Sequence, residues 1–207
     1  MTYPKNNKFL RWFFSHYIKR LIKRNFQAVN FNSIEVDEQK SVLLLANHFS
    51  WWDGFVLYCI NDKLLKKNFH IIVLKETMQK VKFFKYLGAF SVNKSSRTVM
   101  QTLTYAAQLL NNPQNLVVIF PQGKLYSNFI TRVNFEKGVM KVLKQADNKF
   151  QLITAVSFIE NFKHQKPSVN VYLQNIPYTK FENITELNDI YQQHYNAAHQ
   201  QQTEIVL

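Results

Sequence analysis

The chain has 207 residues, 46% of them hydrophobic and 18 of them phenylalanine, so it can bury a core, and a disordered chain is excluded. Its formal net charge is +13, and such an excess attracts polyanions, either nucleic acid or an anionic membrane surface. The single cysteine, Cys59, excludes an internal disulfide and a cysteine-rich zinc site, and its apolar neighbours predict a place in the core.

The first element expected along the chain is a helix over residues 8–26, because apolar side chains recur there at steps of three and four residues. Basic side chains fill much of the rest, and residues 1–26 contain no acidic residue. A basic amphipathic helix rich in aromatics is suited to lie in a bilayer interface, and it is equally suited to pack on its own domain with a basic outer face. Both arrangements can hold at once. No transmembrane span or signal peptide is expected, since charges interrupt every apolar run well short of about 20 residues.

Predicted strands and helices then alternate. Strands are expected at residues 42–46, 69–74, 89–92, 116–120 and 150–158, with an edge strand at 169–173; helices are expected at 53–65, 76–86, 97–111, 135–146 and 184–202. This alternation predicts an α/β fold with a mixed, mainly parallel sheet flanked by helices. The sequence shows no repeat or linker, so we expect one domain over residues 1–207. Its parts are a basic amphipathic helix at 1–27, a motif-bearing core at 40–160 and a polar C-terminal tail at 183–207.

A histidine and an aspartate stand five residues apart directly after the strand expected at 42–46, in Asn47-His48-Phe49-Ser50-Trp51-Trp52-Asp53. In parallel sheets, ligand-binding and active sites usually lie at the carboxyl ends of the strands. Asp53 is expected to cap the following helix while its carboxylate turns back toward His48. An imidazole oriented by a carboxylate is a ready general base, and it needs no serine or cysteine nucleophile.

A second turn closes the strand expected at 116–120, in Phe120-Pro121-Gln122-Gly123-Lys124. A strand that ends in Pro-x-Gly turns sharply and exposes backbone amides, which suits an anionic ligand.

These segments together resemble the motifs of the glycerolipid (lysophospholipid) acyltransferase superfamily. Residues 47–53 resemble its first motif, Asn-His-x-Ser-x-x-Asp, and residues 120–124 resemble its third, Phe-Pro-Glu-Gly-Thr-Arg. Three further segments agree in order: residues 88–94 with the second motif, 135–138 with the Phe-x-x-Gly after the third, and 153–156 with the fourth. The resemblance covers about residues 40–160.

The resemblance implies an acyltransferase of lipid metabolism that moves a fatty acyl group from acyl-CoA or an acyl-carrier protein to the hydroxyl of a lysophospholipid-like acceptor. His48 would be the general base, and Asp53 would accept the other ring N–H and stabilise the imidazolium. The acyl thioester is a co-substrate, and no other cofactor and no metal is implied. The expected partners are the acyl donor, the lipid acceptor and an anionic membrane surface, with the protein peripheral on the cytoplasmic face.

The residues expected to bind substrate are Lys94, Gln122, Gly123, Lys124 and Lys137. Several depart from the family pattern: Gln122 replaces a glutamate, Leu125 an arginine, and Lys94 the arginine of the second motif. A lysine binds phosphate as a point charge but not as a bidentate fork, so the acceptor is expected to differ from a simple glycerol phosphate. The altered motif leaves open an alternative, a non-catalytic lipid-binding protein of the same fold. A nucleic-acid partner rests on charge alone and is not expected, because no recognised module is present.

Overall fold

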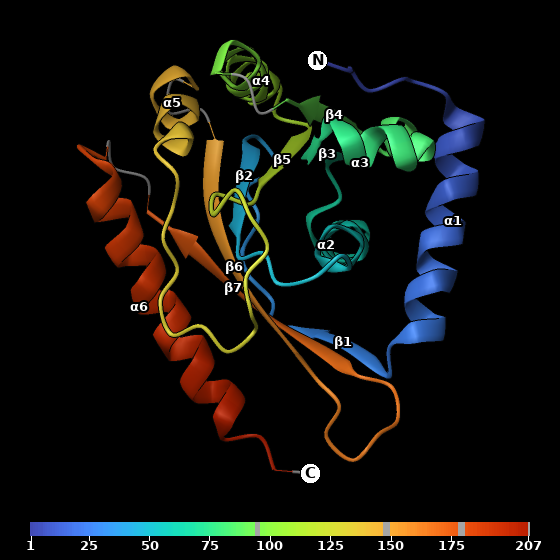
Figure 1. The fold of residues 1–207 in the computed structure, drawn as a ribbon, viewed down its shortest axis with the longest axis vertical. Coiled ribbons are helices and arrows are strands. Elements are labelled where there is room, and N and C mark those ends of the chain that lie inside the picture. The colour runs from blue at the N-terminus through green and yellow to red at the C-terminus, as the bar shows by residue number, and fades with distance from the viewer. Residues whose placement is uncertain (94–95, 147–149, 178–180, 207) are drawn as a thin grey trace.

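The computed structural model describes residues 1–93, 96–146, 150–177 and 181–206. Within these ranges seven strands form one sheet in the order β1-β7-β6-β2-β5-β3-β4, with helices on both faces (Figure 1). The strands are β1 (Ala28–Phe31), β2 (Ser41–Ala46), β3 (Asn68–Leu74), β4 (Ala89–Val92), β5 (Asn115–Ile119), β6 (Phe150–Glu160) and β7 (Ser168–Ile176). The helical elements are α1 (Lys8–Asn25), α2 (Asp53–Ile60), η1 (Asn61–Leu65), α3 (Lys75–Lys80), η2 (Lys82–Leu87), α4 (Ser96–Leu109), α5 (Gly138–Gln145) and α6 (Ile184–Thr203). The predicted α/β fold is confirmed.

The central strands are parallel, so their carboxyl ends share one edge of the sheet. β2 pairs in parallel with β5 and with β6, and β3 pairs in parallel with β5 and with β4. Among the strand pairings of the described residues, only that of β6 with β7 is antiparallel. Because β2 is buried along its whole length, its six residues form a nearly continuous apolar run, as strands covered on both faces do.

Side chains of β2 alternate between two core clusters, one on each face of the sheet. Leu43 and Leu45 pack with α4, α5 and α6, whereas Leu44 and Ala46 pack with α1 and α2. Cys59 of α2 belongs to the second cluster, and burial raises the pKa of its thiol to about 11. Its predicted role in packing is confirmed.

Three predicted helices have different bounds in the structure. The helix expected at 53–65 is α-helical only to Ile60 and ends as the π-helical turn η1. The one expected at 76–86 breaks at Val81, whose backbone is not helical, into α3 and the 3-10 segment η2. The one expected at 135–146 begins at Gly138, because residues 120–137 form a long connection after β5.

The strand expected at the sheet edge is internal. β7 lies between β6 and β1, so this edge of the sheet belongs to β1, a four-residue strand that was not predicted from the sequence. β1 is too short to show a hydrophobic period. Its place depends on contacts with β7, such as the 2.9 Å hydrogen bond from Asn30 Nδ2 to Asn170 Oδ1.

The C-terminal segment forms the predicted helix, but one face of it lies in the core. Leu187, Tyr191, Tyr195 and Ala198 are buried against the sheet, and the Tyr191 hydroxyl donates to the Ala155 carbonyl at 2.8 Å. Many of the other residues of α6 are glutamine or asparagine, so its apolar stripe is hard to recognise in the sequence.

Helix α1 packs on the domain and also presents apolar side chains to solvent. Ile18 and Ile22 are buried in the second cluster, while Phe9 and Trp12 are 68% and 58% exposed. Both arrangements weighed for this helix are therefore compatible with its geometry. Among the helices of the described residues, none combines the length and the apolar character needed to cross a bilayer.

Candidate active site

The carboxyl ends of β2 and β5 meet at the centre of the sheet, and the chain leaves them toward opposite faces. β2 continues into α2, which packs in one core cluster, and β5 continues toward α5, which packs in the other. In such sheets the usual place for a ligand is the crevice outside the carboxyl ends of adjacent parallel strands whose connections diverge in this way. Residues 47–53 and 120–124 follow directly after these two strand ends.

The structure brings the two predicted catalytic side chains together. His48 Nδ1 lies 2.8 Å from Asp53 Oδ2. An ionised carboxylate only accepts hydrogen bonds, so in the neutral imidazole Nδ1 carries the proton and Nε2 keeps a lone pair. The Asp53 side chain is 4% exposed, and that of His48 is 26% exposed. A buried carboxylate therefore orients an imidazole that a substrate can reach.

Asp53 is not the cap of α2, which corrects the sequence-based expectation. The capping residue is Trp52, without a side-chain bond, and Asp53 is the first residue of the helix. Its Oδ2 instead accepts backbone N–H groups of Phe49 at 2.8 Å and Ser50 at 2.9 Å. The loop that carries His48 thus wraps around the carboxylate that orients its ring.

The His48 backbone and ring are held by the segment that follows β5. Its N–H donates to Gln122 Oε1 at 2.8 Å, and its carbonyl accepts from the Tyr126 N–H at 2.9 Å. Its ring stacks on Phe120, with centroids 4.2 Å apart. Each of these contacts joins segments more than seventy residues apart in sequence, and together they leave the imidazole little freedom to turn.

Asn47 connects the same loop to the neighbouring strand β6 by hydrogen bonds. Its Nδ2 donates to the Ser157 carbonyl at 2.9 Å, and its Oδ1 accepts the Ser157 N–H at 2.8 Å. A buried asparagine that satisfies both backbone groups of one residue acts as a local extension of the sheet. No role was predicted for Asn47 from the sequence, although its place between a buried strand and the histidine is a signal that could have indicated one.

The predicted substrate-binding residues occupy different environments. Gln122 is 1% exposed and turns inward to His48, whereas Lys124 and Lys137 are exposed. Gly123 has φ +66°, in the left-handed region that favours glycine, so the turn suits this residue. Lys94 lies outside the described residues. Substrate contacts of all five stay predictions, and the observed contact of Gln122 is with the catalytic loop.

Replacing Gln122 with alanine should loosen His48 without touching the His48–Asp53 pair. It leaves a part-buried N–H unpaired, which costs about 1 kcal/mol, so we expect the free energy of unfolding to fall by that amount and kcat to fall about tenfold as the ring loses its position. Urea unfolding and steady-state kinetics measure both. Gln122→Glu keeps an acceptor oxygen and should retain more of the rate than the alanine variant; an alanine variant with unchanged stability and rate would contradict this role.

The tryptophans of the loop differ in exposure. Trp52 packs edge-on against Phe26, with centroids 5.2 Å apart. Trp51 is exposed and contacts Phe55 and Phe84 at the border of a groove beside α1.

A parallel-sheet domain with an accessible, carboxylate-oriented imidazole at the carboxyl ends of its central strands has the groups of an enzyme that removes a proton from its substrate. The acyltransferase family model matches residues 25–158, more than half of the chain, so this protein belongs to the acyltransferase family. No curated protein matches the chain at a significant level. The protein is accordingly an acyltransferase, with an acyl donor and an acyl acceptor as its substrates.

Proposed function

We propose that the protein transfers a fatty acyl group from acyl-CoA or an acyl-carrier protein to the hydroxyl of a lysophospholipid-like acceptor. The observation that carries this proposal is the 2.8 Å contact of His48 Nδ1 with the buried Asp53 carboxylate, which leaves Nε2 as the basic nitrogen. The motifs around the pair resemble those of glycerolipid acyltransferases, and family membership supports acyl transfer in general.

In this mechanism, His48 Nε2 takes the proton of the acceptor hydroxyl as its oxygen attacks the thioester carbonyl. The carbon–sulfur bond then breaks, the thiolate leaves, and the imidazolium returns the proton to sulfur. The products are an ester and a free thiol. Asp53 stabilises the imidazolium by a charge-assisted hydrogen bond, and no covalent enzyme intermediate is required.

The acceptor and product are amphiphiles, so we place the enzyme on the anionic cytoplasmic leaflet of a membrane. Exposed aromatic side chains on α1, at Phe9, Trp12, Phe13 and Tyr17, support this placement, as does the net charge of +13. Aromatic and basic side chains together favour the bilayer interface.

A release assay tests the proposed reaction. The full chain is incubated with acyl-CoA or acyl-carrier protein and, separately, with lysolipids that carry phosphate, phosphoglycerol, phosphocholine or no charged head. We expect thiol release that depends on the acceptor, together with an ester product detected by mass. Reactions without acceptor measure simple hydrolysis. Folded protein that releases no thiol with any of these acceptors would refute the proposed acceptor class.

A further inference from the structure

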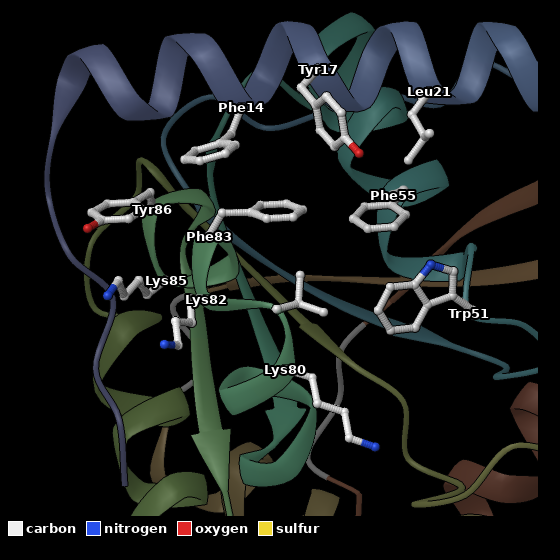
Figure 2. Close-up of a pocket in the computed structure, with 11 residues that line it drawn as sticks. Phe14, Tyr17, Leu21, Trp51, Phe55, Lys80, Lys82, Phe83, Lys85 and Tyr86 are labelled. Atoms are coloured by element: carbon white, nitrogen blue, oxygen red, sulfur yellow. The ribbon is translucent and has the colours of Figure 1, made fainter.

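A groove of about 780 Å³ runs between α1 and η2, separate from the His48–Asp53 pair. Figure 2 shows Phe14, Tyr17 and Leu21 of α1 pointing toward Phe83, Phe55 and Trp51 across it. We call it the aromatic groove and define it by its lining: Phe14, Tyr17, Leu21, Trp51, Phe55, Lys80, Val81, Lys82, Phe83, Lys85 and Tyr86. Its volume lies within the range of about 300–1,000 Å³ that is usual for small-molecule sites.

The walls of the aromatic groove are held by ring contacts between elements distant in sequence. Phe14 stacks on Phe83, with centroids 4.8 Å apart, and Tyr17 meets Phe83 edge-on at 5.9 Å. Phe55 packs edge-on against Trp51 at 5.8 Å. Aromatic pairs of this kind contribute stabilisation in addition to that from the burial of their surface, so the walls of the groove are preformed, and their rings make them apolar.

Lysines supply the charge of the aromatic groove. Lys80, Lys82 and Lys85 line it, no carboxylate does, and within the described ranges none of the three forms a salt bridge. Lys85 Nζ lies over the Tyr86 ring, 5.1 Å from its centroid. Apolar walls with uncompensated cations match an amphiphile that has an acyl chain and an anionic head.

The groove continues into the exposed aromatic face of α1. Tyr17 belongs to both, and Phe13, one turn earlier, is also exposed. If that face lies in the bilayer interface, the groove opens at the depth where phospholipid heads and upper acyl chains are found. A membrane lipid can then reach it without crossing water.

We propose that the aromatic groove binds one anionic phospholipid of the bilayer, with an acyl chain along the rings and the phosphate beside the lysines. This lipid is a docking ligand rather than a substrate, and its binding does not depend on the proposed acceptor. Because Trp51 lies within the His48–Asp53 loop and also lines the groove, the bound lipid turns the catalytic edge toward the membrane.

Vesicle sedimentation without an acyl donor tests the charge of the groove. Vesicles of phosphatidylcholine with a quarter of phosphatidylglycerol are compared with pure phosphatidylcholine. Each lysine near an anionic surface contributes on the order of 1 kcal/mol, so K82Q/K85Q should weaken binding to the anionic vesicles about tenfold or more. The control K141Q/K144Q removes the same charge from α5, on the opposite face of the sheet, and should change binding by less than about twofold.

A second measurement locates the lipid chain. In a W12F/W52F background, Trp51 is the only tryptophan, and chain-brominated phosphatidylglycerol in the vesicles should quench its emission. Val81→Phe leaves every charge in place but fills the groove, so it should remove most of the quenching and weaken binding while circular dichroism stays unchanged. Neutral brominated phosphatidylcholine should quench less.

Two results would overturn the lipid site: equal losses from the two lysine pairs, or unchanged Trp51 quenching in Val81→Phe. The first would mean that the basic surface as a whole attracts the membrane, and the second that the lipid chain lies outside the groove. These assays need no turnover. An enzyme inactive toward every lysolipid yet quenched as described would contradict the proposed acceptor class and leave the groove assignment standing.

Discussion

His48→Ala should lower kcat for acyl transfer by about 10²–10⁴-fold, the usual contribution of a general base. The ring is 26% exposed and rests on Phe120, so its loss removes the base without opening the deep core. Thiol release with saturating donor and acceptor measures the effect, and near-unchanged circular dichroism and urea unfolding would show that the variant is folded.

His164→Ala is the matched control. His164 lies in the β6–β7 connection and has no contact with His48 or Asp53 among the described hydrogen bonds, and its replacement should leave kcat within about twofold, as for most surface substitutions. Full activity in folded His48→Ala would end the assignment of this imidazole as the base.

Replacing Asp53 should separate the charge of the carboxylate from its geometry. One oxygen, Oδ2, accepts from His48 Nδ1 and from the backbone N–H groups of Phe49 and Ser50. An asparagine amide oxygen can occupy that position and keep the loop and the tautomer, but it cannot stabilise the imidazolium by charge. A hydrogen bond to a charged partner is worth about 1.5–3 kcal/mol, so Asp53→Asn should lower kcat about 10–100-fold with little change in stability.

Asp53→Ala removes both the charge and the acceptor. It leaves two N–H groups unpaired at a residue that is 4% exposed, so we expect a further loss of kcat and a free energy of unfolding lower by about 2–4 kcal/mol. Urea unfolding and kinetics of the two variants together make the comparison. Equal activity of Asp53→Asn and wild type would show that the carboxylate charge takes no part in the reaction.

Much of the fold was predictable because the central strands are short, continuous apolar runs bounded by turn residues. The predicted strand at 42–46 appears as Ser41–Ala46, and that at 89–92 appears with the same bounds. Helix ends were less predictable. Whether residues 81 or 135–137 continue a helix depends on what packs against them: Phe135 is buried, with its N–H donating to Asn188 Oδ1 on α6.

At the candidate site, too, local features were predictable from the sequence and long-range contacts were not. His48 and Asp53 are five residues apart on one loop, so their pairing follows from their spacing and from the strand end before them. Both features can be recognised in the amino-acid sequence. Gln122 lies 74 positions from His48, and its inward turn exists only because β5 runs beside β2. The aromatic groove likewise joins α1 to η2, two segments whose adjacency no local pattern encodes. Short-range geometry is set by neighbouring residues and their turn preferences, whereas contacts between remote segments depend on how strands order in the sheet and which faces the helices bury.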